Sequence, residues 1–349
     1  MNGTAAEKRK VLLIGGAGYI GRHVAYALHD RGYELIVLDD LSTGSVEYLP
    51  PHELWVNDVT SVPLETFDAL RGTVSAVIHL AALTSVPESV RKPEAYYRVN
   101  TFGTLRALEI AKRTGADRFL FSSTAAVYGE PVELPVRETH PTNPANPYGG
   151  SKLAAELLMR DYCAAHGIRG VAFRYFNVVG CDPELRTGDT RGISDNLVHQ
   201  LLKCVDQPDA DFSVYGNDYD TPDGTPVRDF VHVADIASAH VRMMETADTL
   251  AAPFTVLNIG YGRGFSVKEA FESLRRIAGE RFDPGFEIKP RRAGDIEKIW
   301  ADNAALLACG WRPRFEDLST LLSHSYQWSI RASKDEANRG KRRSADNEQ

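Results

Sequence analysis

The chain carries a tyrosine and a lysine four residues apart at the start of a predicted helix. They are Tyr148 and Lys152 in the stretch NPYGGSKLAAELL, residues 146–158. Residues i and i+4 share one face of a helix, so both side chains can point at one ligand. A free tyrosine, with a pKa of ~10, is a poor base at neutral pH, and a nearby ammonium favours its phenolate. The pair therefore predicts a tyrosine that acts as a general base.

A hydroxyl residue precedes this pair in the segment FSSTAAVYG, residues 121–129. Thr124 follows RFLFSS, an apolar run that is typical of a buried strand, and there its hydroxyl can bond a reacting oxygen and relay the proton. The other interpretation is a loop cluster of Ser and Thr side chains that satisfies its own backbone. The presence of Tyr148 and Lys152 favours the chemical interpretation.

A glycine-rich turn, GGAGYIG, places Gly15, Gly18 and Gly21 between a predicted strand and a predicted helix. Glycines let the backbone approach a pyrophosphate closely at the N-terminus of a helix, although such turns also occur for packing alone. Asp39 ends the next strand, where a carboxylate can bond the adenosine ribose hydroxyls. Because Asp39 and Asp40 would repel a 2′-phosphate, the sequence favours NAD over NADP.

An oxidised nicotinamide beside Tyr148 would carry a positive charge, which favours the phenolate just as the ammonium of Lys152 does. Gly149 and Gly150 lie between these two side chains. We expect this glycine pair to allow close approach of substrate or backbone. The site then predicted is a tyrosine-based oxidoreductase site with NAD as its cofactor.

Short apolar runs alternate with helical patterns through the first half of the chain. The candidate strands are 11–16, 34–40, 76–82 and 118–123, with a further apolar segment that ends at Asp58. This alternation predicts an α/β fold with a doubly wound parallel sheet, a Rossmann fold. We expect an NAD-binding domain over 9–176, a smaller α/β substrate domain over 177–330 with parts that return to the sheet, and a disordered charged tail over 331–349.

The composition excludes several classes of protein. A length of 349 residues favours two domains, and a net charge of −7 disfavours a nucleic-acid binder. No apolar run reaches the ~18 residues of a membrane span, and the N-terminus lacks the apolar core of a signal peptide. The four cysteines (Cys163, Cys181, Cys204, Cys309) have no metal-ligand spacing. A reduced, cytoplasmic protein with free thiols and no metal site is expected.

Six motifs follow one another in an order that carries a family resemblance. They are GGAGYIG, SSTAAVYG, PYGGSK, RYFNVVG, GNDYDTPDGTPVRDFVHVAD and PRRAGDIEKIWAD. Over about residues 10–330 the chain resembles the extended short-chain dehydrogenase/reductase family, and specifically its UDP-glucose (UDP-galactose) 4-epimerases. The fifth motif is highly specific to that subfamily. The nucleotide sugar enters the prediction through this resemblance.

The resemblance implies that Tyr148 is the base, Lys152 its electrostatic partner and Thr124 the hydroxyl that bonds the sugar. It implies cofactor contacts from Gly15, Gly18, Tyr19, Ile20, Gly21, Asp39, Asp58, Val59, Leu80, Ala81, Ser122, Tyr148, Lys152 and Tyr175. It implies substrate contacts from Thr124, Asn177, Asn196, Leu197, Tyr215, Arg228, Arg292, Asp295 and Ile299. Two arginines suit a diphosphate because a guanidinium offers paired donors. Without the motifs, both arginines would be assigned to solvated surface.

The implied reaction is NAD-dependent interconversion of UDP-glucose and UDP-galactose through a 4-keto intermediate. Ile299 occupies the position that gates the sugar pocket. A tyrosine there restricts some members to glucose and galactose, whereas a small residue admits N-acetyl sugars. Isoleucine is intermediate, so UDP-GlcNAc and UDP-GalNAc stay open as substrates. Thr84 and Val99 replace a lysine and an asparagine that contact the cofactor in several members, which predicts looser NAD binding.

Three alternatives have to be weighed. A 4,6-dehydratase commonly needs an acidic pair directly after the Ser or Thr, where this chain has Ala125 and Ala126. A 4-epimerase for UDP-glucuronate or a UDP-pentose would share every catalytic residue discussed. A catalytically inactive NAD-binding regulator should have lost Tyr148 or Lys152, and both remain.

The family resemblance also implies a homodimer, formed by helices near 93–115 and 148–166. The apolar side chains that would supply such a surface, or equally the core of one monomer, are Tyr96, Leu105, Leu108, Leu157 and Leu158. The sequence leaves both interpretations open.

Overall fold

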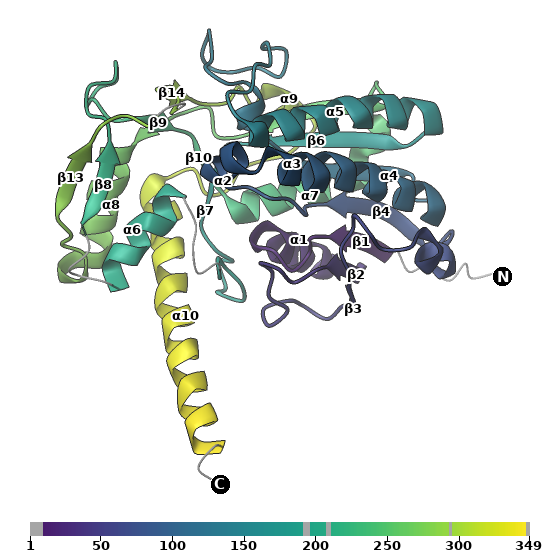
Figure 1. The fold of residues 1–349 in the computed structure, drawn as a ribbon, viewed down its shortest axis with the longest axis horizontal. Coiled ribbons are helices and arrows are strands. Elements are labelled where there is room, and N and C mark those ends of the chain that lie inside the picture. The colour runs from purple at the N-terminus through teal and green to yellow at the C-terminus, as the bar shows by residue number, and fades with distance from the viewer. Residues whose placement is uncertain (1–9, 191–195, 207–210, 293–294, 347–349) are drawn as a thin grey trace.

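The structure, a computed structural model, describes residues 10–190, 196–206, 211–292 and 295–346, with side chains described as far as residue 335. Its centre is a seven-stranded sheet in the order β11-β6-β5-β4-β1-β2-β3 (Figure 1). These strands are β1 (Lys10–Ile14), β2 (Glu34–Asp39), β3 (Glu53–Val56), β4 (Val74–His79), β5 (Arg118–Thr124), β6 (Arg169–Tyr175) and β11 (Phe254–Ile259). Every neighbouring pair in this sheet is parallel. The doubly wound α/β sheet predicted from the sequence is confirmed.

The apolar runs form strands buried on both faces, and successive residues of β1 point to opposite sides. Val11 and Leu13 belong to one core cluster, which includes residues of α1 (Tyr19–His29) and α7 (Val233–Thr246). Leu12 and Ile14 belong to a second cluster, which includes residues of α4 (Gly103–Thr114) and α5 (Pro147–His166). Helices therefore cover both faces of the sheet, as a continuous apolar strand pattern requires.

The strand order reverses between β1 and β4, which are neighbours in the sheet but not in sequence. Ligands of such sheets bind outside the carboxyl ends of the strands at this switch point. The glycine-rich turn follows β1 there, and Leu80 follows β4. The fold thus places these predicted cofactor residues together at the carboxyl ends of the parallel strands.

Several short elements lie between β3 and β4, between β4 and β5, and after β5. They are η1 (Leu64–Leu70), α2 (Val86–Arg91), α3 (Pro93–Tyr96), the π-helix η2 (Tyr97–Phe102) and η3 (Ala125–Val127). A π-helical turn inside a run of helix often occurs at a functional site. Here η2 packs against the start of α5.

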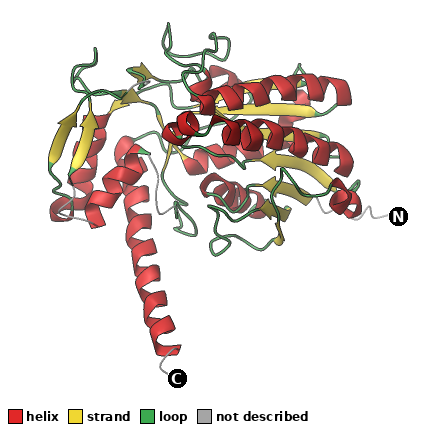
Figure 2. Cartoon of the chain, in the orientation of Figure 1, coloured by secondary structure: helices red, strands yellow, loops and turns green. Residues whose placement is uncertain are grey.

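The second half of the chain builds three small sheets beside the large one (Figure 2). Their strands are β7 (Asn177–Val179) with β10 (Phe230–His232), β9 (Val227–Arg228) with β12 (Phe265–Ser266) and β14 (Lys298–Ile299), and β8 (Phe212–Tyr215) with β13 (Phe286–Lys289). The helices are α6 (Leu197–Asp206), α8 (Val267–Ala278), α9 (Ala304–Ala308) and α10 (Leu318–Asp346), with the short turns η4 (Ala247–Thr249) and η5 (Gly279–Arg281). The same half also supplies β11 to the large sheet.

The structure differs from the expected disordered tail. Residues 331–346 continue α10, which extends away from the rest of the molecule (Figure 1). The segment is rich in Ala, Lys and Arg, which are good helix formers, and Arg331 forms an i,i+4 ion pair with Asp335 at 3.8 Å. A helix satisfies its backbone internally, so it needs no core there. Residues 347–349 of the predicted tail lie outside the described residues.

Candidate active site

The glycine-rich turn packs closely against its neighbours. Gly15 has a φ of +80°, and a Cβ on it would lie 2.3 Å from the backbone nitrogen of Ala81. A Cβ on Gly21 would lie 2.3 Å from the carbonyl oxygen of Gly15. Gly18 is the N-cap of α1, and no side chain caps the first turn of that helix. A turn without side chains in front of an uncapped helix N-terminus fits a pyrophosphate.

The carboxylate of Asp39 is fixed over this turn. Its Oδ2 accepts a hydrogen bond from the Ala17 amide at 2.9 Å, and its Oδ1 accepts one from the Leu41 amide at 2.9 Å. Burial raises the pKa of Asp39, and these two hydrogen bonds oppose the rise. The carboxylate is therefore held in one orientation at the end of β2, where the sequence predicts a contact with the ribose.

The remaining predicted cofactor positions take different surroundings. The amides of Leu80 and Ala81 both donate to the carbonyl of Ile14, at 2.7 and 3.0 Å, which holds the end of β4 against the end of β1. Asp58 is exposed and accepts hydrogen bonds from the amide and the hydroxyl of Thr60. Val59 is buried in the core. The side chains of Asp58 and Val59 thus have local structural roles.

The first turn of α5 explains the glycine pair. Asn146 caps the helix by accepting a hydrogen bond from the Gly149 amide at 3.0 Å. A Cβ on Gly149 would lie 2.6 Å from the carbonyl oxygen of Ala126, and one on Gly150 would lie 2.7 Å from the phenol oxygen of Tyr97. The missing side chains let η3 and η2 close over the helix start that carries Tyr148.

Thr124 and Tyr148 are brought together at the end of β5. The ring of Tyr148 is half-buried and lies edge-on to Tyr96, with ring centres 6.4 Å apart. Burial raises the pKa of Tyr148, and a hydrogen bond between its phenol and the Thr124 side chain opposes the rise. Thr124 Oγ1 also accepts a hydrogen bond from the Ala126 amide at 3.1 Å. The hydroxyl of Thr124 thus contacts both Tyr148 and its own backbone, and its catalytic role stays a prediction.

Lys152 is buried one turn further along α5. Its Nζ donates to the carbonyl oxygen of Ser122 at 2.8 Å and lies 4.7 Å from the centre of the Phe121 ring. Burial lowers the pKa of Lys152 to about 7, and the charge of Glu156 opposes the fall. The sequence predicts that Lys152 favours the phenolate of Tyr148. In the structure the ammonium donates to the end of β5, and burial is the largest effect on the pKa of Tyr148, which it raises.

Behind these residues lies a buried ion pair that the sequence did not predict. Arg174 of β6 donates to both carboxylate oxygens of Glu156, at 3.1 and 2.6 Å. The Ser123 hydroxyl also donates to Glu156. Ser123 and Arg174 are register neighbours on β5 and β6, and Glu156 lies four residues after Lys152. The repeat of polar residues at 148, 152 and 156 was the sequence signal.

Tyr175, at the end of β6, lies near the same group. Its phenol oxygen is 2.8 Å from Nε2 of His240. Burial raises the pKa of Tyr175, opposed by a hydrogen bond to the Ser122 side chain, and the charge of Tyr148 acts in the same direction as burial. The structure therefore brings Tyr175 beside Ser122 and Tyr148, where the resemblance implies a cofactor contact.

Four predicted substrate residues gather in the second half of the chain. The guanidinium of Arg292 lies 4.3 Å from the centre of the Tyr215 ring and pairs with Asp295 at 2.9 Å. Burial lowers the pKa of Arg228, and the charge of Asp295 opposes this effect. A flat ring under a guanidinium, with a second arginine close by, can hold an aromatic base and a diphosphate.

The other substrate positions have clear structural partners. Asn196 accepts a hydrogen bond from the Val198 amide at 2.9 Å and donates to the Val178 carbonyl at 3.3 Å, so it fastens the start of α6 to β7. Leu197 begins α6, and the Asn177 amide pairs with the carbonyl of Asp229. Asn177, Asn196 and Leu197 thus take part in local structure, and the substrate contacts that the family resemblance implies for them stay predictions.

Ile299 is the residue that the family resemblance places at the gate of the sugar pocket. It is buried in a small apolar cluster with Phe176, Ala125 and Val127. Because Ala125 follows Thr124 directly, this cluster places Ile299 close to the predicted catalytic hydroxyl.

The two positions that depart from the family lie near the start of η2. Thr84 is exposed, and Val99 is partly buried in η2. Asn100, next to Val99, exchanges hydrogen bonds with the backbone of Leu83 and donates to Ser151 at 3.0 Å. Asn100 thus fastens this segment to α5, and the looser NAD binding expected from Thr84 and Val99 stays a prediction.

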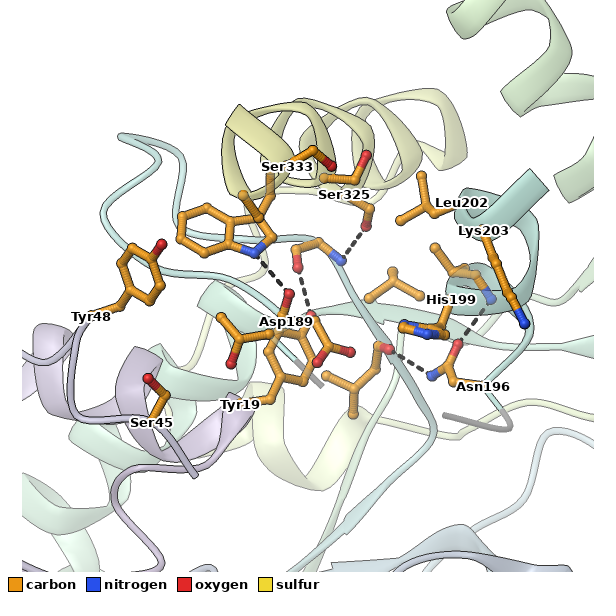
Figure 3. Close-up of a pocket in the computed structure, with 18 of the residues that line it drawn as sticks. Tyr19, Ser45, Tyr48, Asp189, Asn196, His199, Leu202, Lys203, Ser325 and Ser333 are labelled. Carbon is orange, nitrogen blue, oxygen red and sulfur yellow. Dashed lines mark hydrogen bonds between the residues drawn. The ribbon is translucent and has the colours of Figure 1, made fainter. Parts of the chain in front are cut away.

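A cavity of about 590 Å³ lies between the loop after β2, the segment that follows β7, the start of α6 and α10 (Figure 3). Its wall includes Tyr19 from the glycine-rich turn and Asn196 from the start of α6. Tyr19 donates to the carbonyl oxygen of Gly180 at 2.6 Å. One predicted cofactor residue, Tyr19, and one predicted substrate residue, Asn196, therefore share this cavity, whereas Tyr148 does not line it.

Comparison with known proteins identifies the family. Residues 11–260 match the model of the NAD dependent epimerase/dehydratase family. A UDP-glucose 4-epimerase from Azospirillum brasilense is 42% identical over 327 residues, which are 93% of each chain. A UDP-glucose-4-epimerase from Stenotrophomonas maltophila, solved with NAD and formylated UDP-arabinopyranose, has a TM-score of 0.86 and 33% identity, over 94% of this chain and 99% of that chain. A UDP-Glc/GlcNAc 4-epimerase from Campylobacter jejuni has a TM-score of 0.78 and 36% identity, over 93% and 99%.

Proposed function

The chain belongs to the NAD dependent epimerase/dehydratase family, and we propose that it is a UDP-glucose 4-epimerase that interconverts UDP-glucose and UDP-galactose. The observation that carries the proposal is the contact between Tyr148 and Thr124 at the carboxyl edge of the sheet. A phenol and a hydroxyl meet there, on the same edge as a turn that fits a pyrophosphate.

The glycine-rich turn and Asp39 would hold NAD, and the bound cofactor would supply reversible hydride transfer at C4 of the sugar, the carbon that the reaction inverts. The protein's own groups handle the proton. Tyr148 would accept the proton of the 4-hydroxyl, and the Thr124 hydroxyl would hold the same oxygen in line. Lys152 secures the end of β5 through the Ser122 carbonyl and adds positive charge nearby.

The chain's own groups leave the pKa of Tyr148 above its usual value, because burial is the largest effect on it. A cationic nicotinamide ring would act in the opposite direction. The phenolate would then be favoured when oxidised cofactor is in place, which suits a base that must act only on a loaded enzyme.

The nucleotide must stay fixed while the keto sugar turns. Arg228 and Arg292 are proposed to hold the diphosphate, and the Tyr215 ring under Arg292 is proposed to help shape the site for the nucleotide. Ile299 and its apolar cluster would contact the sugar without directional bonds. Firm anchoring at one end and loose contact at the other permit the rotation.

We extend the proposal to N-acetylated sugars, since Ile299 is smaller than a tyrosine. The similar enzyme from Campylobacter jejuni is described as acting on both UDP-Glc and UDP-GlcNAc. A UDP-pentose 4-epimerase is the second candidate, supported by the UDP-arabinopyranose derivative bound to the Stenotrophomonas relative.

A homodimer is also proposed, with a narrower surface than the sequence suggests. Tyr96 and Leu108 are completely buried in the monomer, so they belong to its core. Leu157 on α5 and Phe102 in η2 are 48% and 45% exposed, and they are available to a second copy. Light scattering that gives the mass of a single chain would contradict this part of the proposal.

The location proposed is the cytoplasm. All four cysteines of the chain are free, which fits a reducing compartment. Among the described residues, we find no helix with the length and apolarity that crossing a membrane requires. Labelling the thiols in intact cells with a reagent that cannot cross membranes would contradict the location if they reacted.

The decisive experiment follows the sugar by proton NMR without added cofactor. UDP-galactose, UDP-GalNAc and a UDP-pentose are incubated separately with purified protein, and then again with NAD added. We expect UDP-galactose to convert. Tyr148→Phe should lower turnover by about 10²- to 10⁴-fold, the contribution of a general base, with its NAD content unchanged. Tyr162→Phe on the same helix is the matched control. Full turnover by Tyr148→Phe would sink the mechanism, and conversion of the pentose alone would favour the second candidate.

A further inference from the structure

Arg22 is a buried arginine for which the proposed reaction has no role so far. It follows Gly21 directly on α1, and only 1% of it is exposed. Burying a guanidinium is costly unless hydrogen bonds satisfy its donors. Its partners therefore indicate what it is for.

The first partners of Arg22 lie in the cofactor-binding half. Its Nη1 donates to the carbonyl oxygen of Ala17 at 2.7 Å and to that of Ser45 at 3.4 Å. Ala17 lies within the glycine-rich turn, and its amide donates to Asp39. The Ser45 amide also donates to the Ala17 carbonyl, at 3.0 Å. Arg22 thus joins the phosphate turn to the loop that follows Asp39.

The remaining partners lie more than 160 residues further along the chain. The Nε of Arg22 donates to Thr187 Oγ1 at 3.0 Å, and its Nη2 donates to the Gly188 carbonyl at 2.7 Å and to Thr190 Oγ1 at 2.9 Å. This segment leads from β7 toward α6, at whose start lie Asn196 and Leu197, two residues for which the family resemblance implies substrate contacts. One side chain therefore connects both halves of the site.

The far side of the same segment is held by α10. The indole nitrogen of Trp328 donates to the Asp189 carbonyl at 2.8 Å, and Arg331 donates to the Leu185 carbonyl at 2.7 Å. The ring of Tyr48, from the loop after β2, packs edge-on against Trp328 with ring centres 5.0 Å apart. Figure 3 shows Tyr48, Asp189 and Tyr19 around the shared cavity. Residues 182–190 are thereby held between α10 and Arg22.

We propose that Arg22 is a positioning residue for NAD: it locks the phosphate turn and the loop after Asp39 onto residues 182–190, so that the cofactor stays bound through repeated turnovers. The reaction has no net redox change, so release of NAD would only interrupt it. A guanidinium suits this task because its planar set of five donors serves three segments at once, whereas an ammonium has three donors on one atom.

The electrostatics of the turn agree with this role. Burial raises the pKa of Asp39, and the charge of Arg22 is among the effects that oppose the rise. An ionised Asp39 keeps its two backbone hydrogen bonds at full strength. Arg22 therefore supports the geometry of Asp39 through Ala17 and its charge through space.

The inference rests on the proposed NAD site, so the test measures nucleotide directly. Wild type, Arg22→Lys and Thr187→Val are purified in parallel, the nucleotide is extracted and quantified per chain, and the dissociation constant of NAD is measured by titration. We expect Arg22→Lys to weaken NAD binding at least about tenfold, the effect of losing one charge-assisted hydrogen bond, and Thr187→Val to weaken it by a smaller factor. Turnover at saturating NAD should stay within about threefold of wild type.

Arg31→Gln is the matched control, since Arg31 is an exposed arginine just after the same helix and pairs with Glu245. It should leave NAD binding unchanged. If Arg22→Lys does not fold, Thr187→Val decides the matter, because valine keeps the shape and removes only the hydroxyl. NAD binding unchanged in both variants would overturn the inference, as would lost turnover with NAD binding intact. Wild-type protein that neither carries nor binds NAD would instead refute the proposed function.

Discussion

The ammonium of Lys152 donates a hydrogen bond of 2.8 Å to the main-chain oxygen of Ser122. Ser122 lies two residues before Thr124 on β5, and Lys152 lies one helical turn after Tyr148 on α5. The lysine therefore sets the spacing between the helix that carries the base and the strand that carries the hydroxyl. Its role is geometric as well as electrostatic.

Glu156 extends this link by one more turn. Replacing it with glutamine removes the negative charge that opposes the fall in the pKa of Lys152 from burial. The pKa of Lys152 should then fall below its wild-type value of about 7. Lys152 would lose its proton, and the enzyme its activity, at a lower pH than in the wild type. Because Arg174 would be left buried without its carboxylate, we also expect a loss of about 3–5 kcal/mol of stability. Profiles of turnover against pH and urea unfolding measure the two effects.

Glu109→Gln is the control for this prediction, because Glu109 pairs with Arg106 near the surface of α4. It should leave the alkaline limb of the turnover–pH profile where it is and change the free energy of unfolding by less than about 0.5 kcal/mol. An unshifted alkaline limb in Glu156→Gln would show that the charge of Glu156 does not reach Lys152.

The sequence predicts the parts of this site that depend on local pattern. Strand alternation gives the sheet, and the glycine spacing gives the turn beside Asp39. The sequence does not predict the contacts of Arg174, because they depend on the register of β6 against β5. Composition alone also predicts disorder for 331–346, since it counts apolar burial and not the internal hydrogen bonds of a helix. The capping roles of Asp58 and Asn196 could not be separated from ligand binding without their partners.

Four buried histidines should make the fold sensitive to acid. Burial lowers the pKa of His23 and His240 to about 4, that of His79 to about 3 and that of His232 to about 2. Their unfolded pKa is near 6.5, so between pH 6.5 and about 4 the unfolded chain binds more protons than the folded one. Stability should therefore fall as pH falls through that window, by about 1.4 kcal/mol per pH unit for each histidine.

His240→Gln tests the contribution of one histidine to the change of unfolding free energy with pH. The amide keeps a partner for the Tyr175 phenol but cannot titrate. The free energy of unfolding, measured in urea between pH 4.5 and 6.5, should lose about 1.4 kcal/mol per pH unit of its slope. His166→Gln, at the exposed end of α5, should leave the slope as it is. Equal slopes in wild type and His240→Gln would mean that His240 is protonated in the folded protein.

Ile299 should set the range of sugars. It is 4% exposed and packs with Phe176, so a larger side chain must extend into the space beside the catalytic hydroxyl. Ile299→Tyr should lower kcat/KM for UDP-GalNAc at least about tenfold, a loss of about 1.4 kcal/mol, and change UDP-galactose less than about threefold. Competition between the two sugars in one tube measures the ratio. Parallel losses on both substrates would assign Ile299 to the core alone.

The glycine pair offers a test in which adjacent positions should behave oppositely. A Cβ on Gly149 meets the backbone oxygen of Ala126 at 2.6 Å, whereas one on Gly150 meets the phenol of Tyr97, a side chain that is 45% exposed. The backbone of Ala126 cannot move without moving η3, whereas the exposed ring of Tyr97 can change its rotamer. Gly149→Ala should therefore cost about 1–3 kcal/mol and lower turnover, since Thr124 moves with η3.

Gly150→Ala should be neutral or stabilising by up to about 1 kcal/mol, because alanine replaces glycine inside a helix. Thermal unfolding and turnover of the two variants separate the effects. A double variant, Tyr97→Ala with Gly150→Ala, also removes the side chain that the new Cβ would meet. If Gly150→Ala proved as damaging as Gly149→Ala, and the double variant did not recover, the phenol would not be the group that the second glycine accommodates. Recovery in the double variant would show that Gly150 makes room for Tyr97, and that only Gly149 is required for the approach of Thr124 to Tyr148.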